Sequence, residues 1–248
     1  MHFLTYCLFI LFAYPLSWLP LNLLYALCGP LKFFLQSVFS YRKKVVITNL
    51  QNAFPEKTKG QIDQLASDFY RFLAELVIEN IKFFSISQSE IHRMVTLKNP
   101  EVLHNFLAEN KQIILVVGHF GNWELGSLIL PMELNVPVKV IFKQQRNHWI
   151  GKLLNRVRSS TGSKMLEMNQ VPREMLADKH RPNITVFLAD QNPLNQWAAY
   201  TSELFGQKVY VYPGPEKMAR KTGAVVVYGA MKRVDRGQIG RASCRERV

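Results

Sequence analysis

Cysteine is scarce in this sequence, with only Cys7, Cys28 and Cys244 among 248 residues. Three cysteines without CxxC spacing exclude a disulfide-stabilised scaffold and offer no typical zinc site. Acidic residues are also few, because 18 Asp and Glu stand against 31 Lys and Arg, a net charge of +13. That excess favours an anionic partner: a phospholipid surface, a nucleic acid or an acidic protein. The hydrophobic content of 48% excludes a disordered chain, and the length suits one compact domain with a small appendage.

Charged side chains are absent from residues 1–31. The run Phe3–Cys28 is apolar and long enough to cross a bilayer, which takes about 20 residues. Pro15 and Pro20 interrupt the run, so a broken, tilted or re-entrant helix fits as well as a straight span. The first positive charges follow the run, which by the positive-inside rule keeps the next domain in the cytoplasm. We expect residues 1–31 to anchor the protein in a membrane, and a buried core hairpin is the alternative.

The last ten residues, Ile239–Val248, look unlike the rest of the chain. They read IGRASCRERV, with three Arg and no apolar period. We interpret residues 239–248 as a non-native tail, which leaves residues 32–238 as the main domain. The natural protein is then expected to continue with C-terminal elements of its own.

Apolar residues recur at helical spacing through Gln61–Phe84, which predicts a long amphipathic helix. The preceding segment Tyr41–Lys59 is basic and amphipathic, a composition that suits an anionic membrane surface. Further along, short apolar runs alternate with helical segments. This alternation predicts an α/β fold, with a mixed, mainly parallel sheet flanked by helices. The predicted strands are Ile113–Val117, Val138–Phe142, Ile184–Ala189 and Ala224–Ala230, and the predicted helices are Pro100–Glu109, His148–Arg158 and Glu216–Lys221.

Directly after the first predicted strand, residues 118–124 read Gly-His-Phe-Gly-Asn-Trp-Glu. His119 at a strand end can take a proton from an alcohol, and a carboxylate on the other ring nitrogen would fix the tautomer. Since five positions put two side chains about 140° apart on an ideal helix, we expect Glu124 to reach back from the first helical turn. The two glycines permit a tight turn, and Asn122 is a candidate helix cap. A core histidine beside an unrelated glutamate is the alternative, but this combination at a strand exit favours catalysis.

Four segments resemble known sequence blocks in the same order. The motif GHFGNWE resembles that of the glycerolipid-type acyltransferases, in which His, four residues and then Asp or Glu follow one another. More narrowly, the chain resembles the bacterial lipid A biosynthesis (lauroyl/myristoyl) acyltransferase family, from about Phe3 to Arg233. The matching segments are YRKKVVITNLQNAFP (residues 41–55), GHFGNWE (118–124), VIFKQQRNHWIGKLLNRVRSSTG (140–162) and FLADQNP (187–193).

The resemblance implies an O-acyltransferase that moves a fatty acyl chain from acyl carrier protein to a hydroxyl of lipid A or its precursor. His119 would be the general base, Glu124 would orient and charge-stabilise it, and the hydroxyl would attack the thioester directly. The resemblance also implies an enzyme at the cytoplasmic face of the inner membrane of a Gram-negative bacterium. It implies neither a metal nor a cofactor.

Other residues are candidates for holding the substrates. Backbone N–H groups near Gly121 and Asn122 are candidates for stabilising the oxyanion of the tetrahedral intermediate. Arg156 and Arg158 are candidates for binding an acceptor phosphate, because guanidinium groups pair with phosphate bidentately, and a solvated helix face is their alternative. Asp190 ends a predicted strand and should reach the edge of the substrate site, or it caps a turn.

Three other functions compete with this interpretation. An acyl-CoA-dependent lysophospholipid or glycolipid acyltransferase would use the same His–Glu pair. Such lysophospholipid enzymes usually carry an acidic-Gly-Thr-Arg motif after the later strand, where this chain has Asp-Gln-Asn-Pro at residues 190–193. A non-catalytic membrane-binding protein of the same fold is the further alternative, which replacement of His119 would separate from an enzyme. No nucleic-acid motif accompanies the positive charge, so a nucleic acid is not an expected partner.

Overall fold

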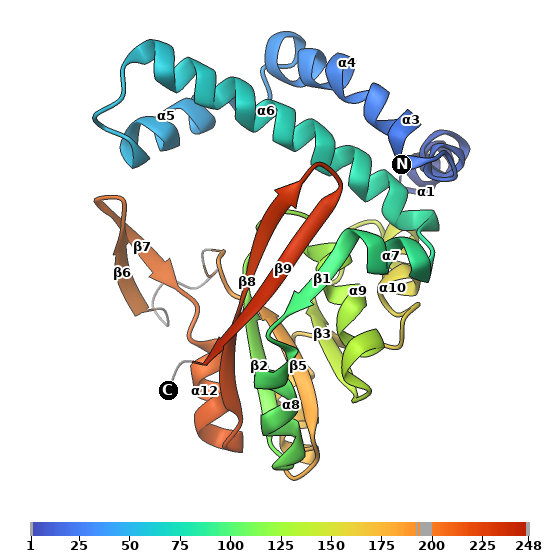
Figure 1. Ribbon diagram of the computed structural model, residues 1–248, viewed down its shortest axis with the longest axis vertical. Helices are drawn as coiled ribbons and strands as arrows, with labels where there is room; N and C mark the ends of the chain where they lie inside the picture. The colour runs from blue at the N-terminus through green and yellow to red at the C-terminus, as the bar shows by residue number, and fades with distance from the viewer. Residues whose placement is uncertain (1, 192, 194–199, 247–248) are drawn as a thin grey trace.

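The computed structural model describes residues 2–191, 193 and 200–246. Figure 1 shows a layer of N-terminal helices, dominated by the long helix α6, across one end of an α/β unit. The elements of the N-terminal part are α1 (His2–Leu8), η1 (Phe9–Ala13), α2 (Tyr14–Ser17), α3 (Leu21–Ala26), α4 (Cys28–Phe33), η2 (Phe34–Val38), α5 (Lys43–Ala53), α6 (Lys59–Lys82), η3 (Phe83–Ser85) and α7 (Gln88–Met94).

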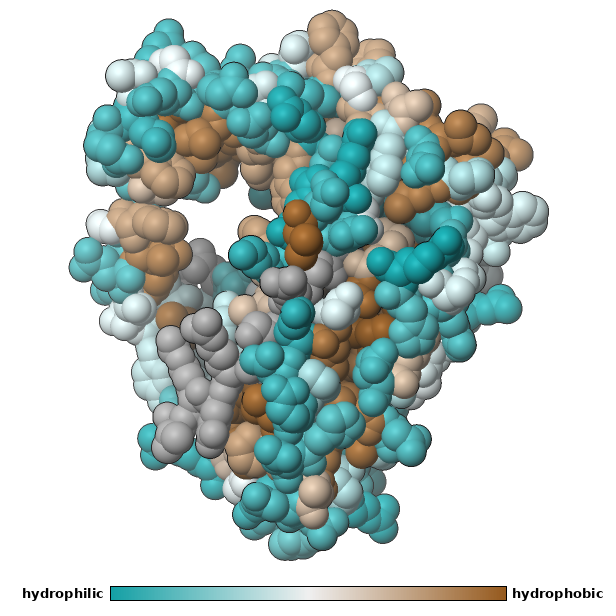
Figure 2. Space-filling view, in the orientation of Figure 1, coloured by the Kyte–Doolittle hydropathy of each residue, from teal (hydrophilic) through white to brown (hydrophobic). Residues whose placement is uncertain are grey.

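The apolar N-terminal segment is a series of short helices. Pro15 lies in the first turn of α2, and the helical stretch continues through it to Ser17. The stretch breaks before Pro20, which directly precedes α3. One face of the segment packs on α6, where Leu24, Tyr25 and Cys28 are buried. Much of the remaining surface is exposed and apolar, as the brown area at the upper right of Figure 2 shows.

One helical stretch, Leu21–Val38, is long and apolar enough to cross a membrane, and Phe3–Ser17 is a shorter apolar stretch. Large apolar side chains are exposed to solvent in these helices and directly after them, including Trp18 at 69% and Phe39 at 71% exposure. An exposed apolar surface of this extent indicates an interaction with membrane or protein. The exposed apolar surface and the length of Leu21–Val38 together suggest membrane association.

A seven-stranded sheet has the order β1-β9-β8-β2-β5-β3-β4 and is parallel except for the antiparallel pair β8 and β9. The predicted α/β fold with a mainly parallel sheet is therefore confirmed. A separate antiparallel hairpin is formed by β6 and β7. The elements are β1 (Val95–Lys98), α8 (Pro100–Ala108), β2 (Gln112–Val117), α9 (Trp123–Leu134), β3 (Val138–Phe142), α10 (His148–Arg158), β4 (Lys164–Glu167), α11 (Val171–Ala177), β5 (Asn183–Leu188), β6 (Tyr200–Leu204), β7 (Gln207–Val211), α12 (Gly214–Thr222), β8 (Val225–Asp235) and β9 (Gln238–Glu246).

All four predicted strands and all predicted helices are present, most with ends shifted by one or two residues. Strand β8 is the exception, because it continues to Asp235 alongside β9. Helix α12 ends at Gly223, whose φ of +73° is the left-handed conformation that favours glycine.

Residues 239–246 of the expected tail lie in β9, and residues 247 and 248 lie outside the described residues. Strand pairing uses backbone groups that every sequence carries, so this position does not decide the origin of the segment. The non-native origin of residues 239–248 stays a prediction. Resequencing the gene tests it, and the same codons continuing into an uninterrupted frame would contradict it.

Strands β2 and β5 position the site at the centre of the sheet. They are parallel neighbours in register, with Val117 opposite Leu188. Their side chains Ile113, Leu115 and Ile184 are buried in the main hydrophobic core. Because the carboxyl ends of parallel strands meet at one edge, the segments that follow β2 and β5 come together there.

Candidate active site

His119 and Asp190 face each other just beyond the ends of β2 and β5. Each lies two residues after the paired residues Val117 and Leu188. His119 Nδ1 is 2.6 Å from Asp190 Oδ1, and the His119 backbone N–H donates to Asp190 Oδ2 at 2.7 Å. Gly118 permits this approach, since a Cβ there would lie 3.2 Å from Oδ2. The sequence places Asp190 at the edge of the site, and the structure brings it onto the histidine ring itself.

The contact with Asp190 determines which nitrogen of His119 is basic. Partial burial raises the pKa of the Asp190 carboxyl, but hydrogen bonds from the His119 ring and backbone lower it further, so the pKa lies below its ordinary value. An ionised carboxylate accepts the proton of Nδ1, which leaves Nε2 as the free base. Nε2 makes a long contact of 3.5 Å with the side-chain nitrogen of Gln191. The His119 side chain is 32% exposed, so a substrate hydroxyl can approach it.

Glu124 does not make the expected hydrogen bond to the His119 ring. Its buried carboxylate accepts two hydrogen bonds from Arg158, one from Nε at 2.7 Å and one from a terminal nitrogen. No hydrogen bond joins Glu124 to His119 in the part of the chain that the structure describes. The reason is electrostatic: a carboxylate buried at the start of α9 needs a counter-charge, and the last turn of α10 supplies one.

Arg158 is likewise engaged inside the protein, which corrects the expectation that it is available for an acceptor phosphate. Its side chain is only 8% exposed. The guanidinium carbon lies 5.4 Å from the centre of the Trp123 ring, which in turn meets the His119 ring edge-to-face at 5.3 Å. Arg158 and Trp123 therefore support one side of the histidine. Arg156, on the same helix, is exposed and remains a candidate for phosphate.

The turn between β2 and α9 is held from both sides. Gly121 has a φ of +62°, which favours glycine. Asn122 caps α9 as predicted, with Oδ1 accepting from the Leu125 backbone N–H at 3.2 Å. Its amide nitrogen donates to Glu79 at 3.3 Å, and the other Glu79 oxygen accepts from the Tyr25 hydroxyl at 2.8 Å. This series of hydrogen bonds joins the N-terminal helices to the histidine turn.

Two buried acidic residues on α6 are absent from the sequence interpretation. Glu75 and Glu79 are 5% and 6% exposed. Burial raises the pKa of Glu79, although its hydrogen-bond donors act in the opposite direction. Glu75 is neutralised by Arg233 and Arg236, the latter at 2.9 Å. Acidic residues four positions apart on a helix normally indicate a solvated face, so the sequence offers no sign of this cluster.

Comparison with known proteins identifies the chain. The model of a family described as bacterial lipid A biosynthesis acyltransferase matches residues 1–243. The chain belongs to this family. A lipid A biosynthesis acyltransferase of Haemophilus influenzae is 24% identical over 218 residues, which are 88% of this chain and 68% of that protein. The resemblance noted in the sequence is confirmed, and the protein is an acyltransferase of lipid A biosynthesis.

In this acyltransferase an apolar pocket opens beside the histidine turn. Val117 and Leu188, the last residues of β2 and β5, line it together with Trp123. Gly126, Ser127 and Leu130 of α9 and Gly229 and Met231 of β8 contribute to its walls, and aliphatic side chains of β1, β2, β3 and β5 form the rest. These linings suit a hydrocarbon chain, because no charged side chain takes part.

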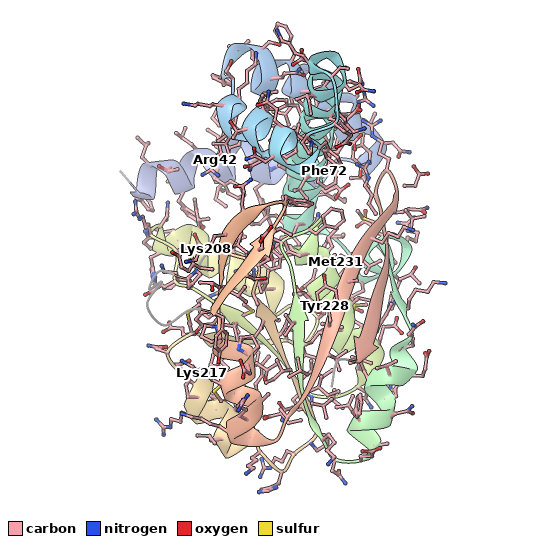
Figure 3. All side chains as sticks on the ribbon, turned by 90° about the vertical axis from the view of Figure 1, so that its left-hand side faces the viewer. Arg42, Phe72, Lys208, Lys217, Tyr228 and Met231 are labelled. Atoms are coloured by element: carbon pink, nitrogen blue, oxygen red, sulfur yellow. The ribbon has the colours of Figure 1, made fainter. Side chains whose placement is uncertain are left out.

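A second, smaller pocket is lined by Phe120, Gly121 and Asn122 of the histidine turn. Phe120 follows His119 and stacks on Phe72 of α6, with ring centres 6.3 Å apart. The carbon of the Arg233 guanidinium lies over the Phe72 ring, 5.3 Å from its centre. Figure 3 shows Phe72 and Met231 at the end of the sheet that α6 covers. The acyltransferase thus has two neighbouring pockets that share Met231: an apolar one, and one lined by aromatic, acidic and basic side chains.

Proposed function

We propose that the protein transfers a fatty acyl chain from acyl carrier protein to a hydroxyl of lipid A or its precursor. The observation that supports this best is the His119–Asp190 pair, which directly follows strand ends that line an apolar pocket. Family membership points to the lipid A-type acceptor. The net charge of +13 favours the donor, because acyl carrier protein is acidic.

The proposed reaction is a direct transfer. His119 Nε2 takes the proton of the acceptor hydroxyl as the oxygen attacks the thioester carbonyl. The carbon–sulfur bond then breaks, and the imidazolium returns the proton to the thiolate of the carrier. Asp190, ionised at neutral pH, stabilises the imidazolium and holds the ring in the required tautomer.

Backbone N–H groups at Gly121 and Asn122 are our proposed oxyanion donors. The space beside Gly121 is open, because a Cβ built there would meet nothing within 4 Å. Glu124 acts in this proposal through Arg158 and Trp123, which brace the histidine, and not as its hydrogen-bond partner. Arg156 is the proposed contact for an acceptor phosphate, since it is exposed at the end of α10.

The proposed location is the cytoplasmic face of the inner membrane. Residues 1–31 would anchor the acyltransferase domain of residues 32–238. The exposed apolar surface of the N-terminal helices supports this arrangement.

The experiment that tests the proposal measures acyl transfer by mass spectrometry. Membranes containing the protein are incubated with acyl carrier protein loaded with a fatty acid and with a lipid A precursor. A mass increase of one acyl chain in the acceptor is the expected result. Transfer only from acyl-CoA to a lysophospholipid would support the competing enzyme class. Lipid binding without transfer from either donor would support a non-catalytic membrane protein.

Asp190→Asn should lower kcat by about 10²-fold and leave KM nearly unchanged, because the imidazolium loses its stabilising charge while the substrate pockets stay intact. The pair is partly exposed, so the Tm should change little at neutral pH. Because the pKa of Asp190 is lowered in the fold, its contribution to stability is complete at neutral pH and is lost as acid protonates the carboxyl. Asp68→Asn, in an exposed pair with Arg71, is the control and should leave kcat unchanged. An unaltered kcat in Asp190→Asn would contradict the proposed pairing.

A further inference from the structure

The hairpin formed by β6 and β7 projects from the molecule, separate from the seven-stranded sheet (Figure 1). All five residues of β6 are exposed. At its base Tyr200 is close enough to Glu216, in the first turn of α12, for this carboxylate to raise the pKa of the Tyr200 hydroxyl. The hairpin is therefore attached at one end and exposed at its turn.

The turn carries an apolar residue in an unfavourable backbone conformation. Leu204 pairs with Gln207, which leaves Phe205 and Gly206 as a two-residue turn. Both have positive φ, +51° and +67°, the pattern of a type I′ turn, in which Asn-Gly is the preferred pair. A bulky side chain at positive φ is a steric outlier, and here the ring gains no burial in compensation, since Phe205 is 62% and Leu204 54% exposed. Because no burial within the protein offsets this backbone strain, we interpret Phe205 as a residue that contacts another molecule.

Basic residues lie on the same side of the molecule as this turn. Arg42, Lys43 and Lys44 are exposed at the start of α5, and Lys208 is exposed on β7. Figure 3 shows Arg42 and Lys208 on one side, with the hairpin below α5. The hairpin itself is nearly neutral, because Glu203 stands opposite Lys208 across the pair of strands.

An opening separates the hairpin from the helices above it, as the left side of Figure 2 shows. The turn end of the hairpin points towards α5 in Figure 1, so an extended surface can touch both elements at once. An exposed apolar tip on the same side of the molecule as a cluster of cations suits the headgroup region of an anionic bilayer.

We propose that Leu204 and Phe205 insert into an anionic phospholipid surface and form a second membrane contact besides the N-terminal helices. The phospholipid phosphates would pair with the cations at the start of α5, while the ring of Phe205 enters the acyl region. This proposal goes beyond the proposed function, because it concerns how the enzyme sits on its membrane. An acidic protein would satisfy the cations but not the paired apolar tip, so the observations favour lipid.

Phe205→Asn separates the membrane contact from folding. Asn-Gly suits a type I′ turn better than Phe-Gly, so the full chain should keep or raise its Tm. Transfer to an acceptor embedded in phosphatidylglycerol–phosphatidylethanolamine vesicles should fall about tenfold, which corresponds to losing the burial of one aromatic side chain. Transfer to a water-soluble short-chain acceptor should stay at the parental rate. Thr201→Asn, an exposed change near the base of β6, should leave both rates unchanged.

An equal loss with both acceptors would overturn the proposal, because the tip would then contact the carrier protein or the acceptor itself. A parental rate on vesicles would overturn it as well.

A second measurement does not depend on activity. Phe205→Trp in the full chain should show fluorescence quenched by vesicles whose acyl chains are brominated, beyond the quenching of the parent protein. Quenching equal to that of the parent would overturn the membrane contact. Quenching without any acyl transfer would retain it while rejecting the proposed function.

Discussion

Replacing His119 by Ala should lower the rate of acyl transfer from acyl carrier protein by about 10²–10⁴-fold, the usual contribution of a positioned general base. Nε2 of His119 is the nitrogen that can receive the proton of an incoming hydroxyl, because Nδ1 is engaged by Asp190 and Nε2 has only the long contact with Gln191. Alanine removes the base but leaves the apolar pocket, whose lining does not include His119. The loss should therefore appear in kcat, measured by the mass increase of the acceptor, with a small change in KM.

Two controls distinguish a lost base from a damaged fold. His119 is exposed, so the Tm of His119→Ala should remain close to that of the parent. His148→Ala removes an imidazole from α10, where its ring contacts Trp149 and not the His119–Asp190 pair. This variant should retain activity. The double variant with Asp190→Asn adds a further test. If Asp190 acts only through His119, the double variant should be no slower than His119→Ala alone. A further large loss in the double variant would assign Asp190 a separate role.

The fold could be predicted from the sequence because its elements carry local patterns. Short apolar runs with a Gly or Pro at one end mark β2, β3 and β5, and these strands appear within a residue or two of their predicted ends. Strands without such a pattern were not predicted: β1 and β4 have four residues each, and β6 is entirely exposed. The length of β8 depends on its pairing with β9, which is a tertiary feature.

The site was predictable only in part, because its contacts depend on strand order. The sequence singles out His119, Asn122 and Asp190, which the structure brings together, but it pairs the histidine with Glu124, the nearest acid along the chain. Asp190 is 71 residues away from His119 and reaches it only because β5 lies beside β2 in register. The periodicity of apolar residues does not determine strand order, so the spacing of residues along the chain could not predict the contact between His119 and Asp190. The same applies to Arg158, whose partner lies 34 residues earlier on another helix.

Glu124→Ala should destabilise the protein by about 3–5 kcal/mol, the typical result of removing one partner from a buried ion pair. The side chains of Glu124 and Arg158 are 11% and 8% exposed, so the arginine left behind would be buried without its counter-charge. Urea denaturation followed by far-UV circular dichroism measures the loss. Glu174→Ala, which breaks the exposed pair with Lys164, is the matched control and should change the free energy of unfolding little.

Variants of Glu124 and Arg158 distinguish between two roles for Glu124. If Glu124 orients His119 directly, Glu124→Ala should lower kcat while the free energy of unfolding is nearly retained. If it serves as the counter-charge of Arg158, as the hydrogen bonds indicate, stability should fall first. The double variant Glu124→Met with Arg158→Met should then recover much of that stability, because two apolar side chains of similar size remove both buried charges together. A double variant as unstable as the sum of the single variants would show that the two side chains do not act as a pair. The double variant could also recover stability but not activity. That result would show that the pair contributes to catalysis because Arg158, through Trp123, supports the His119 ring.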